Sequence, residues 1–300
     1  MSNNLPEHPA LRILLSIAAA ALVAVAPAAA VAQDAGTQTA PPAPGGDLSG
    51  DRVTVAVGGA TVPDYEGADS NQIIPGAVAI GTLGGVDFFT RGTQLYVDLV
   101  KDAAGPGTKV EFGPVVGLRL QRNTLGAIAN RQVRALGTID TAYEVGGSIG
   151  VSRTGVITSD FDVLTARVAY IRDVSGAHDS YVISPQINYT TPLSYTTLVS
   201  LGASADYVGQ GYGRTYFGVT PGGTLASGLR TYDVRDSGFK SYGISLFAVQ
   251  SLSGDLRRGL GIGAGVLYSR LLGKYKDSPL VRDVGAATQW SGAVGLSYTF

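Results

Sequence analysis

The sequence contains no cysteine, which excludes disulfide scaffolds, thiolate metal sites and cysteine nucleophiles. Charged residues are also scarce. They make up 15% of the 300 residues, whereas ordinary domains carry about 25%. The 22 lysines and arginines balance 23 aspartates and glutamates, and without a basic block the chain has no electrostatic footprint for nucleic acid. Glycine, in contrast, is abundant, with 42 residues. This composition is not typical of a cytosolic protein.

One long apolar run is present, at residues 13–32, and its length could span a bilayer as a helix. The run ends with Ala30 and Ala32 in the small-residue positions before Gln33, which is the pattern that signal peptidase requires. We therefore predict a cleaved signal peptide at residues 1–32. The alternative is a retained membrane anchor.

The segment that follows, residues 33–50, is rich in Gln, Thr, Pro and Gly. Such a composition cannot bury enough apolar surface to order itself, so we expect a disordered periplasmic lead-in. Residues 51–300 must then supply the fold. They contain no further apolar run long enough for a transmembrane helix.

The hydrophobic residues of this region alternate with small and polar ones, at a period of two. The last segment shows it best: one phase holds Trp290, Val294, Leu296, Tyr298 and Phe300, and the other holds Gln289, Ser291, Ala293, Ser297 and Thr299. Residues 181–189 repeat the pattern with a tyrosine at each end, as in the aromatic girdles of outer-membrane barrels. A soluble β-sandwich would also alternate, but its solvated face would carry Lys and Glu rather than Gly, Ser, Thr and Asn.

Twelve segments show such alternation, and we predict an all-β transmembrane antiparallel up-and-down barrel of about 12 strands, with a range of 10 to 14. The segments are 51–61, 72–82, 86–99, 108–121, 139–152, 159–172, 179–190, 196–207, 213–220, 237–251, 257–270 and 287–300. An even number places both termini on the periplasmic side. The terminal aromatic residues Tyr298 and Phe300 are expected to form the signal that the barrel-assembly machinery reads.

Four stretches carry a family resemblance. They are Val62-Pro63-Asp64-Tyr65-Glu66-Gly67-Ala68-Asp69; Tyr216-Phe217-Gly218-Val219 with Ser227-Gly228-Leu229 and Tyr232; Leu272-Gly273 through Asp277-Ser278-Pro279; and Gly295-Leu296-Ser297-Tyr298-Thr299-Phe300. In this order they resemble the MltA-interacting protein (MipA/OmpV) family of Gram-negative outer-membrane barrels. The resemblance implies a scaffold that bridges a lytic transglycosylase and a peptidoglycan synthase, while other relatives are described as adhesins or stress-responsive channels. It implies no catalytic residues.

We therefore expect a non-enzymatic protein of the Gram-negative outer membrane, without a cofactor or a metal, that links this membrane to peptidoglycan-remodelling enzymes. The alternatives are a narrow porin-like channel for small solutes and a surface adhesin. The glycine-lined face at 259–265 and the long segment 208–236 suggest an occluded interior, which favours the scaffold. Expected partners are outer-membrane lipid, the assembly machinery, a lytic transglycosylase and a peptidoglycan synthase, but not nucleic acid.

His178 is the only histidine after the predicted cleavage site, and it lies close to Asp179 and Ser180. These residue types suggest a hydrolase. However, a catalytic triad is usually assembled from distant segments, because adjacent side chains point in different directions. We therefore expect His178 to be a polar turn residue.

Asp64, Glu66 and Asp69 form an acidic loop that could bind a divalent cation through carboxylate oxygens. The sequence offers neither EF-hand spacing nor further ligands. We expect a solvated turn, whose backbone path is set by Pro63 and Gly67.

Five charged residues fall on the polar phase of their strands: Glu111, Arg119, Glu144, Arg167 and Asp206. A lipid-facing arginine near the membrane midplane would cost about 2 to 4 kcal/mol, so we place these side chains in the lumen. Their mixed signs favour close ion pairs over a selective ring, which needs charges of one sign. We predict that Arg119 and Arg167 pair with Glu111, Glu144 or Asp206.

Overall fold

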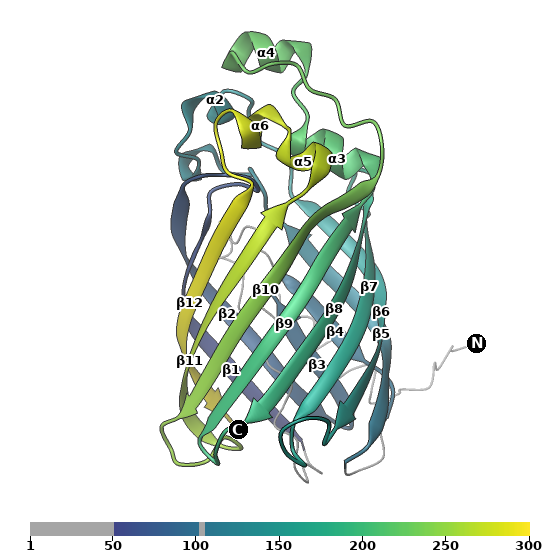
Figure 1. Ribbon diagram of the computed structural model, residues 1–300, viewed down its shortest axis with the longest axis vertical. Coiled ribbons are helices and arrows are strands. Elements are labelled where there is room, and N and C mark those ends of the chain that lie inside the picture. The colour runs from purple at the N-terminus through teal and green to yellow at the C-terminus, as the bar shows by residue number, and fades with distance from the viewer. Residues whose placement is uncertain (1–50, 102–105) are drawn as a thin grey trace, which may run out of the picture.

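The strands form a closed antiparallel barrel in which each strand pairs with its sequence neighbours and β1 pairs with β12 (Figure 1). The computed structural model describes residues 51–101 and 106–300. The fold class predicted from the alternation is confirmed. The predicted signal peptide with Ala30, Ala32 and Gln33, and the predicted lead-in at 33–50, lie outside the described residues.

The strand bounds are β1 (Arg52–Pro63), β2 (Asn71–Leu83), β3 (Val86–Arg91), β4 (Gln94–Asp98), β5 (Thr108–Arg119), β6 (Ala142–Thr154), β7 (Val163–Asp173), β8 (Tyr181–Pro192), β9 (Thr197–Val208), β10 (Gly238–Ser251), β11 (Gly259–Leu271) and β12 (Thr288–Thr299). Apolar side chains such as Val57, Ile149 and Leu296 are exposed on the outer face. This is the alternation expected of a lipid-facing wall.

The strand count of twelve is right, but two of the predicted strands are wrong and their errors cancel. The segment 86–99 is a hairpin of two short strands, which turns at Gly92 with a φ of 56°. The segment 213–220 belongs largely to a helix, α3 (Gln210–Phe217). Tyr212 and Tyr216, four residues apart, are buried on the same face of this helix, so that the apolar spacing is helical.

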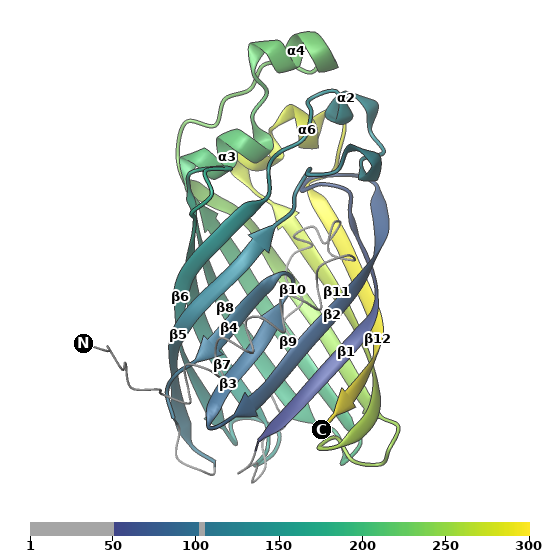
Figure 2. The ribbon, with the colours of Figure 1, turned by 180° about the vertical axis from the view of Figure 1, so that it is seen from behind.

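The two ends of the barrel differ. The turns at 84–85, 155–162, 193–196 and 252–258 are short and lie at the end where the described chain begins and where it finishes. The opposite end carries five connections, three of them much longer, which we call the cap: residues 64–70, 120–141, 174–180, 209–237 and 272–287. Figure 2 shows the same arrangement from behind.

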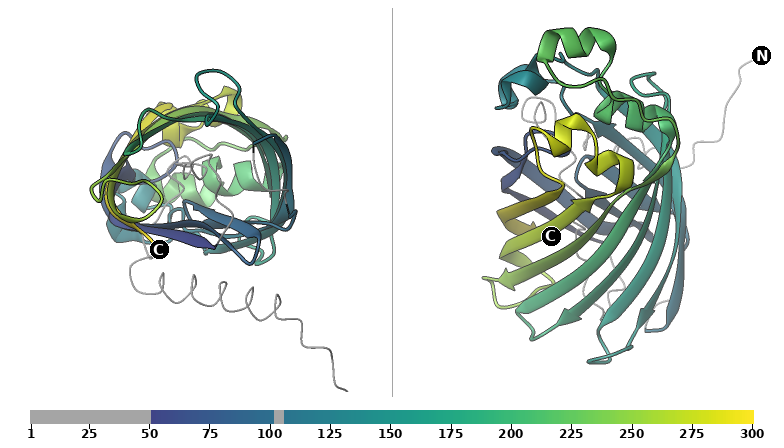
Figure 3. Two further views of the ribbon diagram at one scale, coloured as in Figure 1. Left: turned by 90° about the horizontal axis from the view of Figure 1, so that it is seen from below. Right: turned by 45° about the horizontal axis from the view of Figure 1, so that its top comes forward.

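The cap contains the helices of the described chain. Besides α3 these are η2 (Leu125–Ala127), α2 (Arg131–Arg134), α4 (Pro221–Ser227), α5 (Gly273–Lys276) and α6 (Pro279–Arg282). In the part of the chain that the structure describes, no helix has the length and apolar character needed to cross a membrane. Viewed from the turn end, the green helical segment of the cap lies across the far end of the barrel (Figure 3).

Candidate functional site: the capped mouth of the barrel

The cap is held to the barrel wall by a hydrophobic core. Its members from the cap are Tyr212, Tyr216, Phe217, Val234, Tyr275 and Val281, and those from the wall include Val115, Ile171, Val182, Val208 and Leu271. All of these side chains are buried. The cap is therefore packed into the mouth of the barrel and does not merely lie above it.

A second core lies within the cap itself and joins its separate segments: Tyr65, Ala68, Ile128, Val133, Val219, Leu229 and Leu280. Hydrogen bonds reinforce it. The hydroxyl of Tyr65 donates to the carbonyls of Leu280, at 3.0 Å, and Val284, at 3.2 Å. Ser278 donates from Oγ to the carbonyl of Phe217, at 2.6 Å. Loops distant in sequence thus form one folded unit.

Three tyrosines in the cap have a raised pKa because of their burial, and they stay protonated over the ordinary pH range. Burial raises the pKa of Tyr65 and that of Tyr216 well above the usual value for a phenol. Burial also raises the pKa of Tyr275 to about 12. Neutral phenols can remain in a dry core without the cost of burying a charge.

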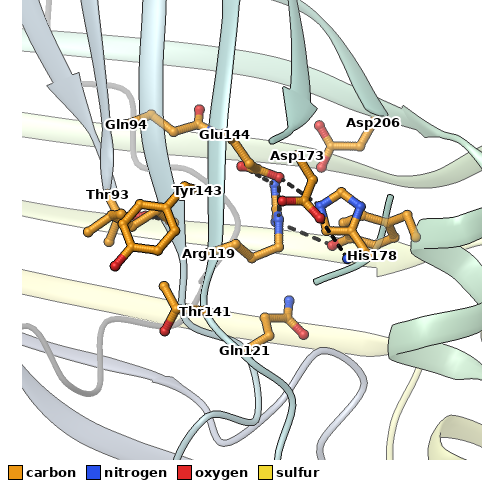
Figure 4. Close-up of polar contacts among 12 residues, drawn as sticks. Thr93, Gln94, Arg119, Gln121, Thr141, Tyr143, Glu144, Asp173, His178 and Asp206 are labelled. Atoms are coloured by element: carbon orange, nitrogen blue, oxygen red, sulfur yellow. Dashed lines mark hydrogen bonds and ion pairs between the residues drawn. The ribbon is translucent and has the colours of Figure 1, made fainter. Parts of the chain in front are cut away.

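The first buried ion pair lies where the cap meets β5 and β6. Arg119 binds Glu144 through two parallel hydrogen bonds, from Nε at 2.9 Å and from Nη2 at 3.1 Å (Figure 4). The two side chains are 3% and 1% exposed. Such a bidentate pair is the geometry in which a guanidinium binds a carboxylate best.

The second ion pair lies between the β1–β2 loop and β10. Lys240 contacts Glu66, and its Nζ lies 3.2 Å from Oδ2 of Asp206. Gln121 adds a hydrogen bond to Glu66, from Nε2 to Oε2 at 3.1 Å. Lys240 is 2% exposed, so this charge depends on its carboxylate partners rather than on water.

Tyr212 connects the two ion pairs. Its hydroxyl donates to Oε2 of Glu66 at 2.8 Å. It also lies 3.3 Å from Nζ of Lys240 and 3.3 Å from Nη1 of Arg119, both of which donate to it. The result is one connected network, which we call the mouth network: Glu66, Arg119, Glu144, His178, Asp206, Tyr212 and Lys240.

His178 lies in a turn, as expected, but its side chain is buried and belongs to this network. Its Nε2 lies 3.3 Å from Oε1 of Glu144, and its ring contacts those of Tyr212 and Tyr216. Asp173 orders the loop by accepting the backbone N–H of His178 at 2.7 Å. The loop therefore folds inwards, to satisfy Glu144.

The acidic loop is solvated at Asp69, but Asp64 and Glu66 turn inwards, which the expectation of a solvated turn did not foresee. Glu66 points into the mouth network, whereas Asp64 accepts hydrogen bonds from Oγ of Ser70, at 2.6 Å, and from the N–H of Ala129, at 3.0 Å. Their carboxylates thus serve different partners. Within residues 51–101 and 106–300, no cluster of three His, Asp or Glu side chains could hold a metal ion.

The remaining predicted lumen charges form a pair away from the cap. Arg167 of β7 binds Glu111 of β5, from Nε at 2.9 Å, and its guanidinium lies 4.4 Å from the ring centre of Phe89. Phe89 in turn stacks on Tyr96, with the ring centres 4.7 Å apart. The structure thus places Arg119 with Glu144, Arg167 with Glu111, and Asp206 with Lys240.

Lys240 and Tyr212 did not emerge as site residues from the sequence, and Glu66 emerged only as a candidate cation ligand. Lys240 has the same sequence phase as the exposed Tyr242 and Ile244, and it turns inwards because the strand register shifts between Phe239 and Ser241. Alternation alone therefore gave no signal of an inward charge. Tyr212 lies in the connection between β9 and β10, and its position depends on the whole cap.

The family model described as MltA-interacting protein MipA matches residues 55–300, which is nearly all of the described chain. The chain belongs to the MipA family. In this MipA-family barrel, three of the four stretches that carry the resemblance meet in the cap, through Tyr65, Phe217, Leu229 and Ser278. The fourth is the end of β12. The stretches that carry the resemblance thus lie in the cap and at the end of β12.

Solved structures similar to this MipA-family barrel are outer-membrane barrels. One is the NanC porin, with 10% identity, a TM-score of 0.41, and coverage of 82% of this chain and 98% of that chain. Another is the COG4313 outer membrane channel from Pseudomonas putida F1, with 13% identity, a TM-score of 0.39, and coverage of 88% and 100%. A search of curated proteins found no match.

Proposed function

We propose that this MipA-family protein is a closed outer-membrane anchor, a structural scaffold whose short turns face the periplasm and bind a peptidoglycan-remodelling enzyme. The orientation follows the usual rule for such barrels, in which short turns are periplasmic and long loops are extracellular. The family description, MltA-interacting protein, names the kind of partner.

The observation that supports this function best is the closed mouth. A channel needs a continuous polar path, and its selectivity comes from rings of like charge. Here the charges at the mouth have mixed signs and bind one another, and hydrophobic side chains of the cap are packed around them. Such a barrel is suited to holding a partner at the membrane.

The turn end offers a surface for that partner. Six apolar side chains are exposed on three of its turns: Val156, Ile157, Phe161, Leu193, Tyr195 and Leu252. Tyr195 is 92% exposed. Two of these turns are joined by a backbone hydrogen bond of 3.2 Å from Leu256 to Tyr195. Exposed apolar residues on ordered turns are typical of protein-binding surfaces.

The test is co-purification of a lytic transglycosylase with the barrel from detergent-solubilised outer membranes. We expect Leu193→Ser combined with Tyr195→Ser to abolish co-purification while leaving the barrel folded. The matched control is Leu225→Ser in α4, which removes a residue of the cap that is 90% exposed and should change nothing. Loss of the enzyme with the cap variant and its retention with the turn variant would contradict the proposal.

A further inference from the structure

The barrel wall has a gap in its strand pairing beside β2. This strand runs from Asn71 to Leu83 and pairs with β1 along almost its whole length, but with β3 only from Ile80 to Leu83. Thr90 extends the contact by one residue, because its Oγ1 accepts the N–H of Ala79 at 2.9 Å. Above that point, residues 71–78 lie beyond the short β3–β4 hairpin (Figure 2). We call these residues the free edge.

Backbone groups on the free edge have no partner strand in the described chain. The N–H and C=O of Ala79 point towards β3. Backbone groups alternate in direction along a strand, so those of every second residue point across the gap, namely those of Ala77, Pro75 and Ile73. Pro75 lacks an N–H. A proline at such a position disfavours the addition of another strand, which would need that donor.

Asn71 and Gln72 at the start of the free edge are polar, and the side chains from Ile73 to Val78 are apolar or small. Ile73 is 85% exposed on the outer face, whereas Ile74 is buried on the inner one. Gly76 shares the inner phase with Ile74, and a Cβ at Gly76 would meet nothing within 4 Å. The run Pro75-Gly76-Ala77 therefore leaves space, where larger residues would fill the gap.

The free edge lies within the lipid-facing part of the wall. β1 pairs with β2 on one side and with β12 on the other, so that Ile73 is in register with Gly292 and Ala77 with Leu296. On β12 these two positions lie between the exposed aromatic residues Trp290 and Tyr298. Open strand edges do not face hydrocarbon, because each unpaired N–H or C=O would be unsatisfied there. The edge therefore needs polar groups beside it, although its surroundings are lipid.

We propose that the free edge is one side of a lateral port for an amphiphile, whose polar head lies inside the barrel and whose acyl chain passes over Pro75-Gly76-Ala77 into the bilayer. The head and its water satisfy the backbone groups of the edge, and the chain contacts the apolar rim. Because the cap closes the axial route, the port connects the interior with the membrane. This inference goes beyond the proposed scaffold function.

Quenching of tryptophan fluorescence by brominated lipid tests the port, since Trp290 is the single tryptophan of the chain. In a Trp290→Phe background, Gly76→Trp places a reporter on the inner phase of the free edge. The control is Ser148→Trp, on the inner phase of β6, which pairs with both neighbours at this position. The unaltered protein, in which Trp290 is exposed to lipid, gives the reference value for full quenching.

In bilayers of phosphatidylcholine brominated in mid-chain, we expect Gly76→Trp to be quenched to about half the extent of Trp290 or more, and Ser148→Trp to be shielded. Brominated stearate in ordinary bilayers forms the second arm: quenching by stearate alone identifies a free fatty acid, and quenching by the phospholipid identifies membrane lipid. Either result supports the port.

A second tryptophan position tests the port if Gly76→Trp does not fold. Val78→Trp also lies on the inner phase of the free edge, where the native side chain is 37% exposed. Shielding of both edge reporters to the level of Ser148→Trp, in both arms, would overturn the port. That result would leave the scaffold proposal intact, because the port and the turn surface lie on different parts of the barrel.

Discussion

The hydroxyl of Tyr212 donates a 2.8 Å hydrogen bond to Glu66 and thereby connects helix α3 to the loop between β1 and β2. The same oxygen accepts hydrogen bonds from Arg119 and Lys240. One phenol of the cap thus contacts both buried cations of the mouth network. The packing of the cap into the mouth and the neutralisation of the buried charges are consequently one structural feature.

Replacement of Lys240 by Met should destabilise the barrel strongly. The change leaves the carboxylates of Glu66 and Asp206, which are 8% and 20% exposed, without their shared cation. Loss of one partner of a buried ion pair costs about 3 to 5 kcal/mol. The measurement is the temperature at which the heat-modifiable band of the folded barrel disappears on electrophoresis.

The control for this variant is Arg257→Ala, which removes an exposed partner of Asp255. Surface ion pairs contribute about 0 to 1 kcal/mol, so the unfolding temperature should hardly move. Equal effects of the two substitutions would show that the mouth network is wet and that burial of its charges is unimportant for the fold.

Replacement of Arg167 by Ala should lower the unfolding temperature clearly and leave the barrel non-conducting. It removes the partner of Glu111 and the cation over the ring of Phe89. Arg167→Lys keeps the charge but loses the planar guanidinium, so its unfolding temperature should lie between those of the parent and of Arg167→Ala. An unchanged unfolding temperature together with altered ion preference would instead indicate a charge that lines a passage.

Acid should weaken the β6–β7 turn through Asp162. Burial alone raises the pKa of this carboxyl, but hydrogen bonds from the N–H groups of Thr158, Val156 and Ile157 and from the hydroxyl of Tyr189 outweigh it and hold the pKa well below the usual range. Because the folded pKa is below the unfolded one of about 3.9, the stabilisation is full above this pH and falls as the pH drops further.

The corresponding experiment compares unfolding temperatures at neutral pH and at about pH 3. Asp162→Asn should be less stable than the parent at neutral pH, and the difference should shrink in acid. The isosteric change leaves the size of the side chain unaltered. A constant difference at the two pH values would contradict the assigned role of the carboxylate.

Deletion of Phe300 should reduce the amount of protein in the outer membrane. Phe300 is 73% exposed at the end of β12, its ring centre lies 4.8 Å from that of Tyr298, and its N–H donates to Val53 at 2.9 Å. The control, Phe239→Ala, removes a lipid-facing aromatic residue at the other end of the barrel. Equal abundance of the deletion variant and the parent in outer-membrane fractions would rule out a sorting role.

The barrel could be predicted from the sequence because each strand carries its own signal. One face of β12 contacts lipid and the other faces a crowded interior, and this produces the alternation from Trp290 to Phe300. The alternation can be recognised within this one strand, without reference to any other segment. The hairpin of β3 and β4 was missed, although the polar sequence Thr90-Arg91-Gly92-Thr93-Gln94 lies at the junction of its two strands and is typical of a turn.

The mouth network could not be predicted in the same way. Arg119 and Glu144 lie on adjacent strands, and their phases place both inside the barrel, so pairing was within reach. Glu66, however, lies in a loop, and its contact with Lys240 exists because the cap folds inwards. A carboxylate beside Pro63 and Gly67 has the sequence signature of a solvated turn, whatever the loop later packs against.

The central claim is that the cap closes the barrel, and single-channel recording of the purified protein in planar bilayers tests it most directly. We predict insertion without conductance steps for the parent and rare, small steps for Lys240→Met, whose cap has lost its anchoring charge. Steady open-channel currents from the parent protein, with steps that Lys240→Met does not change, would contradict the account.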